Sequence, residues 1–225
     1  MFSPFLRKPF EQAVAAGLIP ASLSTIAGTR GTVTDQGDLT YLNLIHLPKI
    51  DGTDPSDLTL GEMEGRRQAI HAVAALKQFM PGCEEAKLRN FGMTLGIRDT
   101  RKIDAHYNLT AADVREQGRF EDSIGIFPEF IDGYGILILP TTGRYFHVPF
   151  RSLVPKGIGN LLVAGRSIGG DKTSHAAVRN MMCCAVSGQG AGVAAAISLR
   201  TDQSFDRLDV APVQQELKRQ GARIQ

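Results

Sequence analysis

Residues 160–199 read NLLVAGRSIGGDKTSHAAVRNMMCCAVSGQGAGVAAAISL and contain two patterns of opposite kind. Asn160 to Gly165 is a short, continuous apolar run entered from a turn at Pro155 to Gly157, which is typical of a β-strand buried on both faces. Ser187 to Leu199 is rich in Gly and Ala. This composition predicts a helix with a small-residue surface that packs closely against other backbone.

The glycines near the start of that helix limit what it can bind. Gly188-Gln189-Gly190-Ala191-Gly192 approaches a dinucleotide-binding fingerprint, but Val193 stands where the last glycine should be. A complete Rossmann half is therefore not encoded here. We expect the helix to begin near Gly188 and to present the free N–H groups of its first turn, where the helix dipole favours negative charge, to something flat and polar.

The composition predicts a soluble globular protein. The chain has 225 residues, of which 43% are hydrophobic and 21% are charged. Lys and Arg total 25 and Asp and Glu total 23, which leaves a net charge of +2. This excess is too small to neutralise a run of phosphates, so we expect neither nucleic acid nor a membrane surface as a partner.

Cysteine use and the N-terminus predict a cytoplasmic location. The three cysteines are Cys83, Cys183 and Cys184. Adjacent cysteines pair poorly with each other, which indicates a reducing compartment and small buried side chains rather than a redox pair. The first ten residues hold no uninterrupted hydrophobic stretch for secretion. No group of His, Cys or carboxylate residues has metal-ligand spacing, so no metal is expected.

The remaining elements follow from periodicity and turn chemistry. Thr110 and Asp113 form a weak capping box, since the carboxylate is Asp rather than Glu. The other patterns predict helices over 10–18, 59–79, 110–117 and within 204–225, a hairpin of 32–34 with 40–47 around a turn at 35–38, strands at 91–97 and 103–109, and strands at 135–139 and 144–148 around a turn at 140–143.

Several segments, in the right order, resemble a known family. Residues 154–166, 175–179 and 187–196 are similar to the C-terminal signature of FAD-dependent oxidoreductases with the glutathione-reductase type of FAD domain. Upstream, residues 95–114 and 144–153 resemble parts of the substrate domain of the same family. Together these matches cover about half of the chain, from Leu95 to Leu199.

The resemblance implies a fold and a cofactor. Residues 1–153 would form an α+β substrate domain, 154–203 the C-terminal strand and helix of an incomplete α/β FAD-binding domain, and 204–225 a C-terminal helical tail. The activity implied is hydride transfer between FAD and a small organic substrate. A helix N-terminus at the flavin pyrimidine edge would stabilise reduced flavin by roughly 0.3 to 2 kcal/mol.

The resemblance also assigns roles to particular residues. His175 would act as a general base or oxyanion partner, and Arg98 or Arg101 would hold a carboxylate or carbonyl of the substrate. Structural ion pairs, helix capping and packing are the alternative roles of these side chains. The predicted cofactor-binding residues are Ala164, Gly165, Arg166, Asp171, Gly188, Gln189, Gly190, Ala191 and Gly192, and the predicted substrate-binding residues are His46, His147 and Arg179.

One family element has no counterpart in this sequence. Members of the family carry an N-terminal Gly-rich βαβ unit that holds the FAD pyrophosphate, whereas this chain begins inside the implied substrate domain. A fragment, one subunit of a split enzyme with a Rossmann-type partner chain, and a degenerate protein all fit this departure. The function expected first is the C-terminal part or subunit of a flavin-dependent oxidoreductase. The alternatives are a non-catalytic assembly subunit that binds a flavoprotein, and a stand-alone binder of small molecules.

Overall fold

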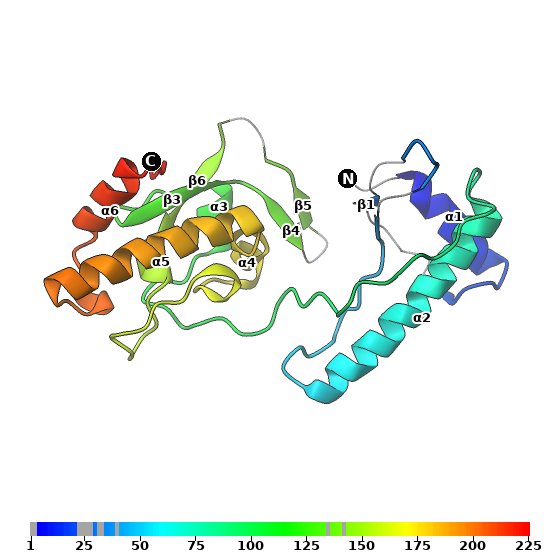
Figure 1. The fold of residues 1–225 in the computed structure, drawn as a ribbon, viewed down its shortest axis with the longest axis horizontal. Helices are drawn as coiled ribbons and strands as arrows, with labels where there is room; N and C mark the ends of the chain where they lie inside the picture. The colour runs from blue at the N-terminus through cyan, green and yellow to red at the C-terminus, as the bar shows by residue number, and fades with distance from the viewer. Residues whose placement is uncertain (1–3, 22–28, 31–33, 39–40, 134–135, 141–142) are drawn as a thin grey trace. The chain divides into compact units, whose positions relative to one another are not determined.

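The computed structural model describes residues 4–21, 29–30, 34–38, 41–133, 136–140 and 143–225 (Figure 1). The chain divides into two compact units, Met1–Thr100 and Arg101–Gln225. The second unit thus contains residues 101–153 together with 154–203 and 204–225. The assignment of these three segments to substrate, cofactor and tail regions stays a prediction.

Two helices build the core of the first unit. α1 (Pro4–Ala15) packs against α2 (Pro55–Phe79), and Phe10, Ala75 and Leu76 are buried between them. α2 starts where Asp54 caps it, because its side chain accepts a hydrogen bond of 2.8 Å from the Ser56 N–H and Pro55 needs no donor partner. The helix predicted over 59–79 is therefore confirmed, with an earlier start.

Other predictions for this unit are only partly correct. The first helix covers 4–15 rather than 10–18. The turn at 35–38 is confirmed, since the Gly37 N–H donates to the Thr34 carbonyl at 2.9 Å. Most of the predicted strand at 32–34 lies outside the described residues. Short strands β1 (Thr29–Arg30) and β2 (Leu42–Asn43) pair antiparallel.

The strand predicted at 91–97 is wrong. These residues are irregular, and no strand among the described residues lies beside them. The Leu95 N–H instead donates to the Glu62 carboxylate on α2. Leu95 also packs over Gly61, where an added Cβ would lie 2.8 Å from Leu95 Cδ2. The segment therefore contacts α2 at Leu95, whose N–H is satisfied by a side chain rather than by a neighbouring strand.

An interrupted hairpin forms the sheet of the second unit. β3 (Ser123–Pro128) pairs antiparallel with β6 (Tyr145–Pro149), and β4 (Ile131–Gly133) pairs with β5 (Ile136–Ile138). A hydrogen bond of 3.3 Å from the Glu129 N–H to the Arg144 carbonyl continues the ladder between the two parts. The strands predicted at 135–139 and 144–148 correspond to β5 and β6, but these two strands lie on the same arm of the hairpin and do not pair with each other. Gly135 and part of the predicted turn at 140–143 lie outside the described residues. β3 and β4 were missed.

Helices cover this hairpin. α3 (Ala111–Arg115) begins at the predicted capping box of Thr110 and Asp113. α4 (Lys172–Val178) packs on β4, and α5 (Met181–Thr201) lies across β3 (Figure 1). α6 (Val210–Arg219) packs against both α5 and β3. Short 3-10 helices lie at Phe150–Ser152 (η2), Gly165–Ser167 (η3) and Phe205–Arg207 (η4). The fold is thus mixed α+β with small antiparallel sheets. The predicted tail helix corresponds to η4 and α6.

Two glycines set the distance between α5 and β3. A Cβ added at Gly190 of α5 would lie 2.5 Å from Ile124 Cδ1, and one added at Gly125 of β3 would collide with Val186 of α5. Each element therefore carries a glycine where the other places a branched side chain. By length and apolar composition α5 is also the one described helix that could cross a membrane, a property that it shares with core helices.

The predicted strand at 160–165 is wrong. Its residues are irregular, and Leu161 is 42% exposed. Among the described residues, the one backbone hydrogen bond recorded for 161–164 runs from the Val163 N–H to the Leu153 carbonyl at 2.9 Å. A strand buried on both faces needs neighbouring strands, and no described strand lies beside this segment. The extended stretch at 103–109 likewise forms only isolated bridges, Ala105 with Pro155 and Leu109 with Gly170.

The α5 packing leads to a matched pair of stability predictions. Gly190→Ala should lower the free energy of unfolding by about 1–3 kcal/mol, because the new methyl group overpacks the contact with Ile124. Gly188→Ala should raise it by about 0.5–1 kcal/mol, because nothing lies within 4 Å of that position and alanine favours the helix. Urea denaturation followed by circular dichroism measures both. Changes of the same sign would contradict the packing described here.

Candidate functional site

The N-terminus of α5 lacks a side-chain cap. Asn180 precedes the helix, but its side-chain amide donates to the carbonyls of Ala177 at 2.8 Å and Ala176 at 3.1 Å and so caps the end of α4 instead. Met181 and Met182 in the first turn are 87% and 73% exposed. The N–H groups of this turn carry the positive end of the helix dipole, which favours an anionic or electron-rich group near the exposed residues Met181 and Met182.

A glycine turn lies beside this helix end. Gly165 adopts φ +76°, and its N–H donates to Ser187 Oγ at 2.9 Å. An added Cβ at Gly165 would lie 3.8 Å from Cys184 Sγ, so the turn packs directly on α5. The flanking residues Ala164 and Arg166 are exposed. The predicted cofactor residues 164–166 therefore lie next to the first two turns of α5.

The predicted residues 188–192 lie elsewhere on the same helix. α5 begins at Met181, so these residues are inside it, and the expected start near Gly188 is wrong. Gly190 packs on Ile124, Gln189 Nε2 donates to Gln220 Oε1 of α6 at 3.0 Å, and Ala191 is half-buried. Gly188 and Gly192 are exposed. The exposed residues of the first turn are instead Met181 and Met182, whereas Cys183 is buried. Asn180, a typical residue before a helix, is the signal in the sequence that could have placed this start.

The surroundings of both cysteines of α5 favour the neutral thiol. Burial raises the pKa of the Cys183 thiol. Burial also raises the pKa of the Cys184 thiol, although the nearby Arg166 guanidinium opposes this. Cys184 Sγ donates to the Arg179 carbonyl at 3.4 Å. Both shifts favour the protonated thiol. Cys183 is a small core side chain, as predicted, whereas Cys184 is half-buried.

Asp171 joins two helices. One carboxylate oxygen accepts from the Ser174 N–H of α4 and the other from the Ala111 N–H of α3, each at 2.7 Å. Its own N–H donates to the Leu109 carbonyl at 2.7 Å. The capping role weighed from the sequence is thus present, while contact with a cofactor stays a prediction. A shallow concavity of about 450 Å³ adjoins Asp171 and is also lined by Lys102, Asn108 and Thr110.

Two other predicted residues lie on α4 or at its end. His175 is 1% exposed and belongs to the interior of the second unit. Arg179 donates to the Asp132 carbonyl, and its guanidinium lies 3.8 Å from the Asp132 carboxylate. Arg179 thereby ties α4 to β4. Catalysis by His175 and substrate binding by Arg179 stay predictions.

The remaining predicted substrate contacts are spread over both units. His46 and Arg98 are exposed in the first unit, and Arg101 is exposed at the start of the second. Their functional roles stay predictions.

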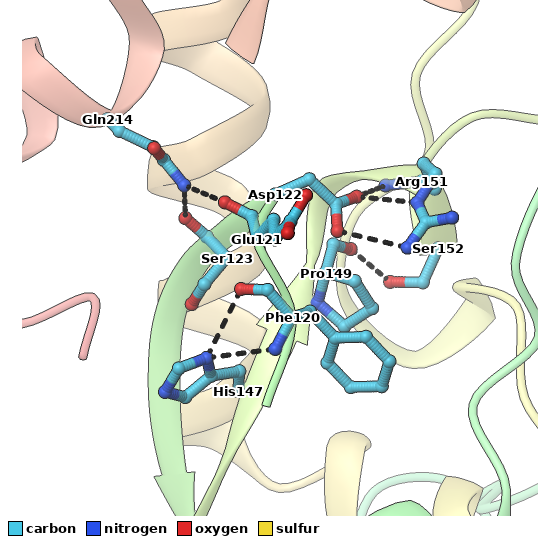
Figure 2. Close-up of polar contacts among 9 residues, drawn as sticks. All are labelled: Phe120, Glu121, Asp122, Ser123, His147, Pro149, Arg151, Ser152 and Gln214. Atoms are coloured by element: carbon cyan, nitrogen blue, oxygen red, sulfur yellow. Dashed lines mark hydrogen bonds and ion pairs between the residues drawn. The ribbon is translucent and has the colours of Figure 1, made fainter. Parts of the chain in front are cut away.

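His147 is held by backbone at the edge of the hairpin (Figure 2). Its Nδ1 accepts from the Phe120 N–H at 3.1 Å, and its ring stacks on Tyr145 with centroids 6.2 Å apart. Burial lowers the pKa of His147, and the Arg119 charge lowers it further, while the Phe120 carbonyl opposes them. The neutral imidazole is therefore favoured, with Nδ1 as an acceptor.

Neighbouring contacts fix the same corner of the sheet. Gln214 of α6 donates to the carbonyls of Glu121 and Ser123, at 2.7 and 2.9 Å, and Arg151 forms an ion pair of 3.0 Å with Asp122 (Figure 2). Among the described residues, His147 therefore has a structural role, because its ring holds the Phe120 backbone and stacks on Tyr145.

A family model describes most of this chain. The model for FAD dependent oxidoreductases matches residues 11–217. The chain belongs to the FAD-dependent oxidoreductase family. No curated protein and no solved structure matches it. The resemblance found from the sequence is thus confirmed at the level of the family, and the uncapped α5 terminus beside the side-chain-free turn at Gly165 fits a flat, electron-rich group such as a flavin.

The Asp171 contacts predict a graded loss of stability in this oxidoreductase. Asp171→Asn keeps one acceptor oxygen and loses the other, so one of the two helix caps is lost. Asp171→Ala loses both caps and should cost about 1–3 kcal/mol, roughly twice the loss in the Asn variant. Thermal unfolding of the three proteins measures this order. An unchanged midpoint in Asp171→Ala would mean that the carboxylate does not hold the helices.

The His147 environment predicts a dependence of stability on pH. The pKa is lowered from 6.5 in the folded chain, so on acidification the unfolded chain binds the proton first. The free energy of unfolding should fall as the pH drops below about 6.5 and level off once the folded His147 is protonated. In His147→Asn, whose Oδ1 can accept from Phe120 without titrating, this part of the decrease should vanish. Urea titrations at about pH 7.5 and about pH 5 compare the two proteins.

Proposed function

We propose that this chain provides the flavin-contacting helix and the substrate-binding region of an oxidoreductase that transfers hydride between FAD and a small organic substrate. The observation that carries the proposal is the start of α5, which has no side-chain cap and whose first two residues, Met181 and Met182, are exposed close to the turn at Gly165. The match of the family model over residues 11–217 supports FAD as the cofactor.

The chain's own residues would bind and orient the flavin. When bound, FAD supplies the hydride acceptor or donor. Met181 and Met182 would donate backbone hydrogen bonds toward the edge of the isoalloxazine that gains negative charge on reduction, and the helix dipole would stabilise that charge. Gly165 would let the backbone approach the ring because no side chain intervenes. Arg166, exposed next to it, would add positive charge.

Substrate would be held by polar residues outside α5. Arg98 or Arg101 would pair with a carboxylate or carbonyl, with His46, His147 or Arg179 as further contacts and His175 as the proton acceptor. A Gly-rich βαβ unit would hold the FAD pyrophosphate, either on an N-terminal half or on a partner chain. The compartment proposed is the cytoplasm.

A second function has its own support. A non-catalytic subunit that binds a flavoprotein would need an exposed apolar surface, and the outer face of α5 carries exposed Met181, Met182 and Leu199. This candidate predicts association without dependence on flavin.

A charge placed at the start of α5 tests the flavin role. Met181→Glu should stabilise the helix by about 0.3–1 kcal/mol, because an acidic side chain suits a helix N-terminus. The same charge should repel the flavin edge and weaken FAD binding by about two- to thirtyfold. Ser56→Glu, which adds the same charge to the exposed first turn of α2, is the matched control and should leave FAD binding unchanged.

Flavin fluorescence and visible absorption during FAD titration measure this effect. The titrations are made with the full chain alone and with a separately produced N-terminal half of a full-length family member. Absence of FAD binding under both conditions would refute the proposed function. Equal FAD affinities of Met181→Glu and the parent chain would remove α5 from the site.

A further inference from the structure

The outer face of β6 carries two aromatic rings. Tyr145 and His147 lie two residues apart, so their side chains point to the same face of the strand. Phe146 and Val148, which alternate with them, are fully buried in the core. The rings of Tyr145 and His147 stack with their centroids 6.2 Å apart. The aromatic pair therefore lies on the face of β6 that does not enter the core.

Two arginines lie over the same tyrosine ring. The guanidinium carbon of Arg119 is 4.1 Å from the ring centroid of Tyr145, and that of Arg223 is 4.9 Å from it. The two arginines come from distant parts of the chain, the loop before β3 and the segment after α6. A cation over an aromatic face is attracted by the ring quadrupole, which offsets part of the repulsion between the two positive charges.

Backbone oxygens position both guanidiniums. Arg119 Nη1 donates to the carbonyls of Gln117 at 2.7 Å and Tyr145 at 2.6 Å. Arg223 Nε donates to the backbone oxygen of Gln225 at 3.0 Å. Among the described residues, neither arginine has a recorded ion pair with an Asp or Glu side chain. Their remaining N–H groups are therefore positioned donors that could serve a ligand.

The acidic side chains near this face are engaged elsewhere. Asp122 forms its ion pair with Arg151 at 3.0 Å, and Glu129 forms one with Arg144. Burial and, to a smaller extent, the charge of Arg119 lower the pKa of His147. The positive charge beside the aromatic pair is thus felt by its neighbours and is available to an anion.

His147 adds a donor without a partner. Its side chain is 6% exposed, and its Nδ1 accepts from the Phe120 N–H, so the neutral ring carries its proton on Nε2. Figure 2 shows Nε2 on the side of the ring away from Phe120. Among the described residues Nε2 has no recorded hydrogen-bond partner, yet it is not fully buried. A polar atom of this kind on a nearly buried side chain indicates a ligand or an ordered water.

We propose that Arg119, Arg223 and His147 bind the phosphate group of a small anion beside Tyr145. Because both guanidiniums lie over one ring, their carbons are at most about 9 Å apart, a span that one tetrahedral anion can bridge. A phosphate group suits this set because it offers three strong acceptor oxygens and a charge of about −1.5 to −2 near neutral pH. A carboxylate offers two oxygens and a single charge, which would leave one arginine uncompensated.

The phosphate group belongs either to inorganic phosphate or to a phosphate monoester whose organic part lies against the aromatic pair. Neither the binding residues nor the expected ligand depends on flavin. The inference therefore goes beyond the proposed function, and the full chain alone can test it.

Calorimetric titrations with inorganic phosphate and with phenyl phosphate, near neutral pH and at a constant ionic strength of about 0.15 M, measure the binding. One phosphate group should bind per chain. Arg119→Gln and Arg223→Gln should each weaken binding by about tenfold or more, because each removes charged donors. Arg207→Gln removes the same charge from an exposed side chain elsewhere in the second unit and should leave the affinity unchanged.

Nuclear magnetic resonance locates the bound anion. The imidazole signals of His147, assigned with His147→Asn, should shift on addition of phosphate, whereas those of His46 in the first unit should not. Circular dichroism establishes that the variants fold. Arg223→Gln keeps the test valid if Arg119→Gln does not fold, because the one recorded hydrogen bond of the Arg223 side chain is to Gln225.

The two probes distinguish the sources of the phosphate group. Binding of phenyl phosphate that is tenfold or more tighter than that of inorganic phosphate would identify a monoester site, and equal or weaker binding would identify inorganic phosphate. Absence of binding by either probe, equal weakening by Arg207→Gln, or signals of His147 that do not shift would each overturn the inference. Binding that neither Arg119→Gln nor Arg223→Gln weakens would also overturn it.

Discussion

The close approach of α5 to β3 is the constraint on which the second unit depends. Gly190 and Gly125 each remove a side chain at the point where Ile124 or Val186 from the other element enters. Because protein interiors are densely packed, this contact fixes how α5 lies on the hairpin. α6 then packs on both elements, and Gln214 reaches the β3 backbone. The turn at Gly165 is held to α5 through Ser187, so the candidate flavin site inherits its geometry from a contact on another face of the helix.

Local signals in the sequence predicted local structure well. The capping box at Thr110 and Asp113 and the end of α2 before Pro81 depend on residues a few positions apart, and both are present. β3 was missed because its recognition requires its partner β6, about twenty residues later. The segment 160–165 shows the converse error. Its apolar pattern is typical of a strand that is covered on both faces, but none of the described strands lies beside this segment.

The candidate site was predicted only in part, because some of its features depend on local sequence and others on contacts between distant segments. A positive φ favours glycine at position 165, so a sequence motif could identify this position. The start of α5 was misplaced because the glycines at 188, 190 and 192, which lie inside the helix and of which Gly190 packs on β3, were interpreted as a helix start. Asp171 and Arg179 lie in the motif and fix backbone through side-chain contacts. A motif residue can therefore position the site without touching a ligand, and the sequence does not separate these two roles.

The different faces of α5 have different surroundings. One side of α5 packs on β3, another holds the turn at Gly165, a third is uncharged and exposed, and its N-terminus is open. Because a helix moves largely as a rigid body, the packing of α5 on β3 also fixes where the N-terminal end of the helix points. The small side chain at the packed position Gly190 follows from this contact, because a larger one would collide with Ile124 and push α5 away from the hairpin.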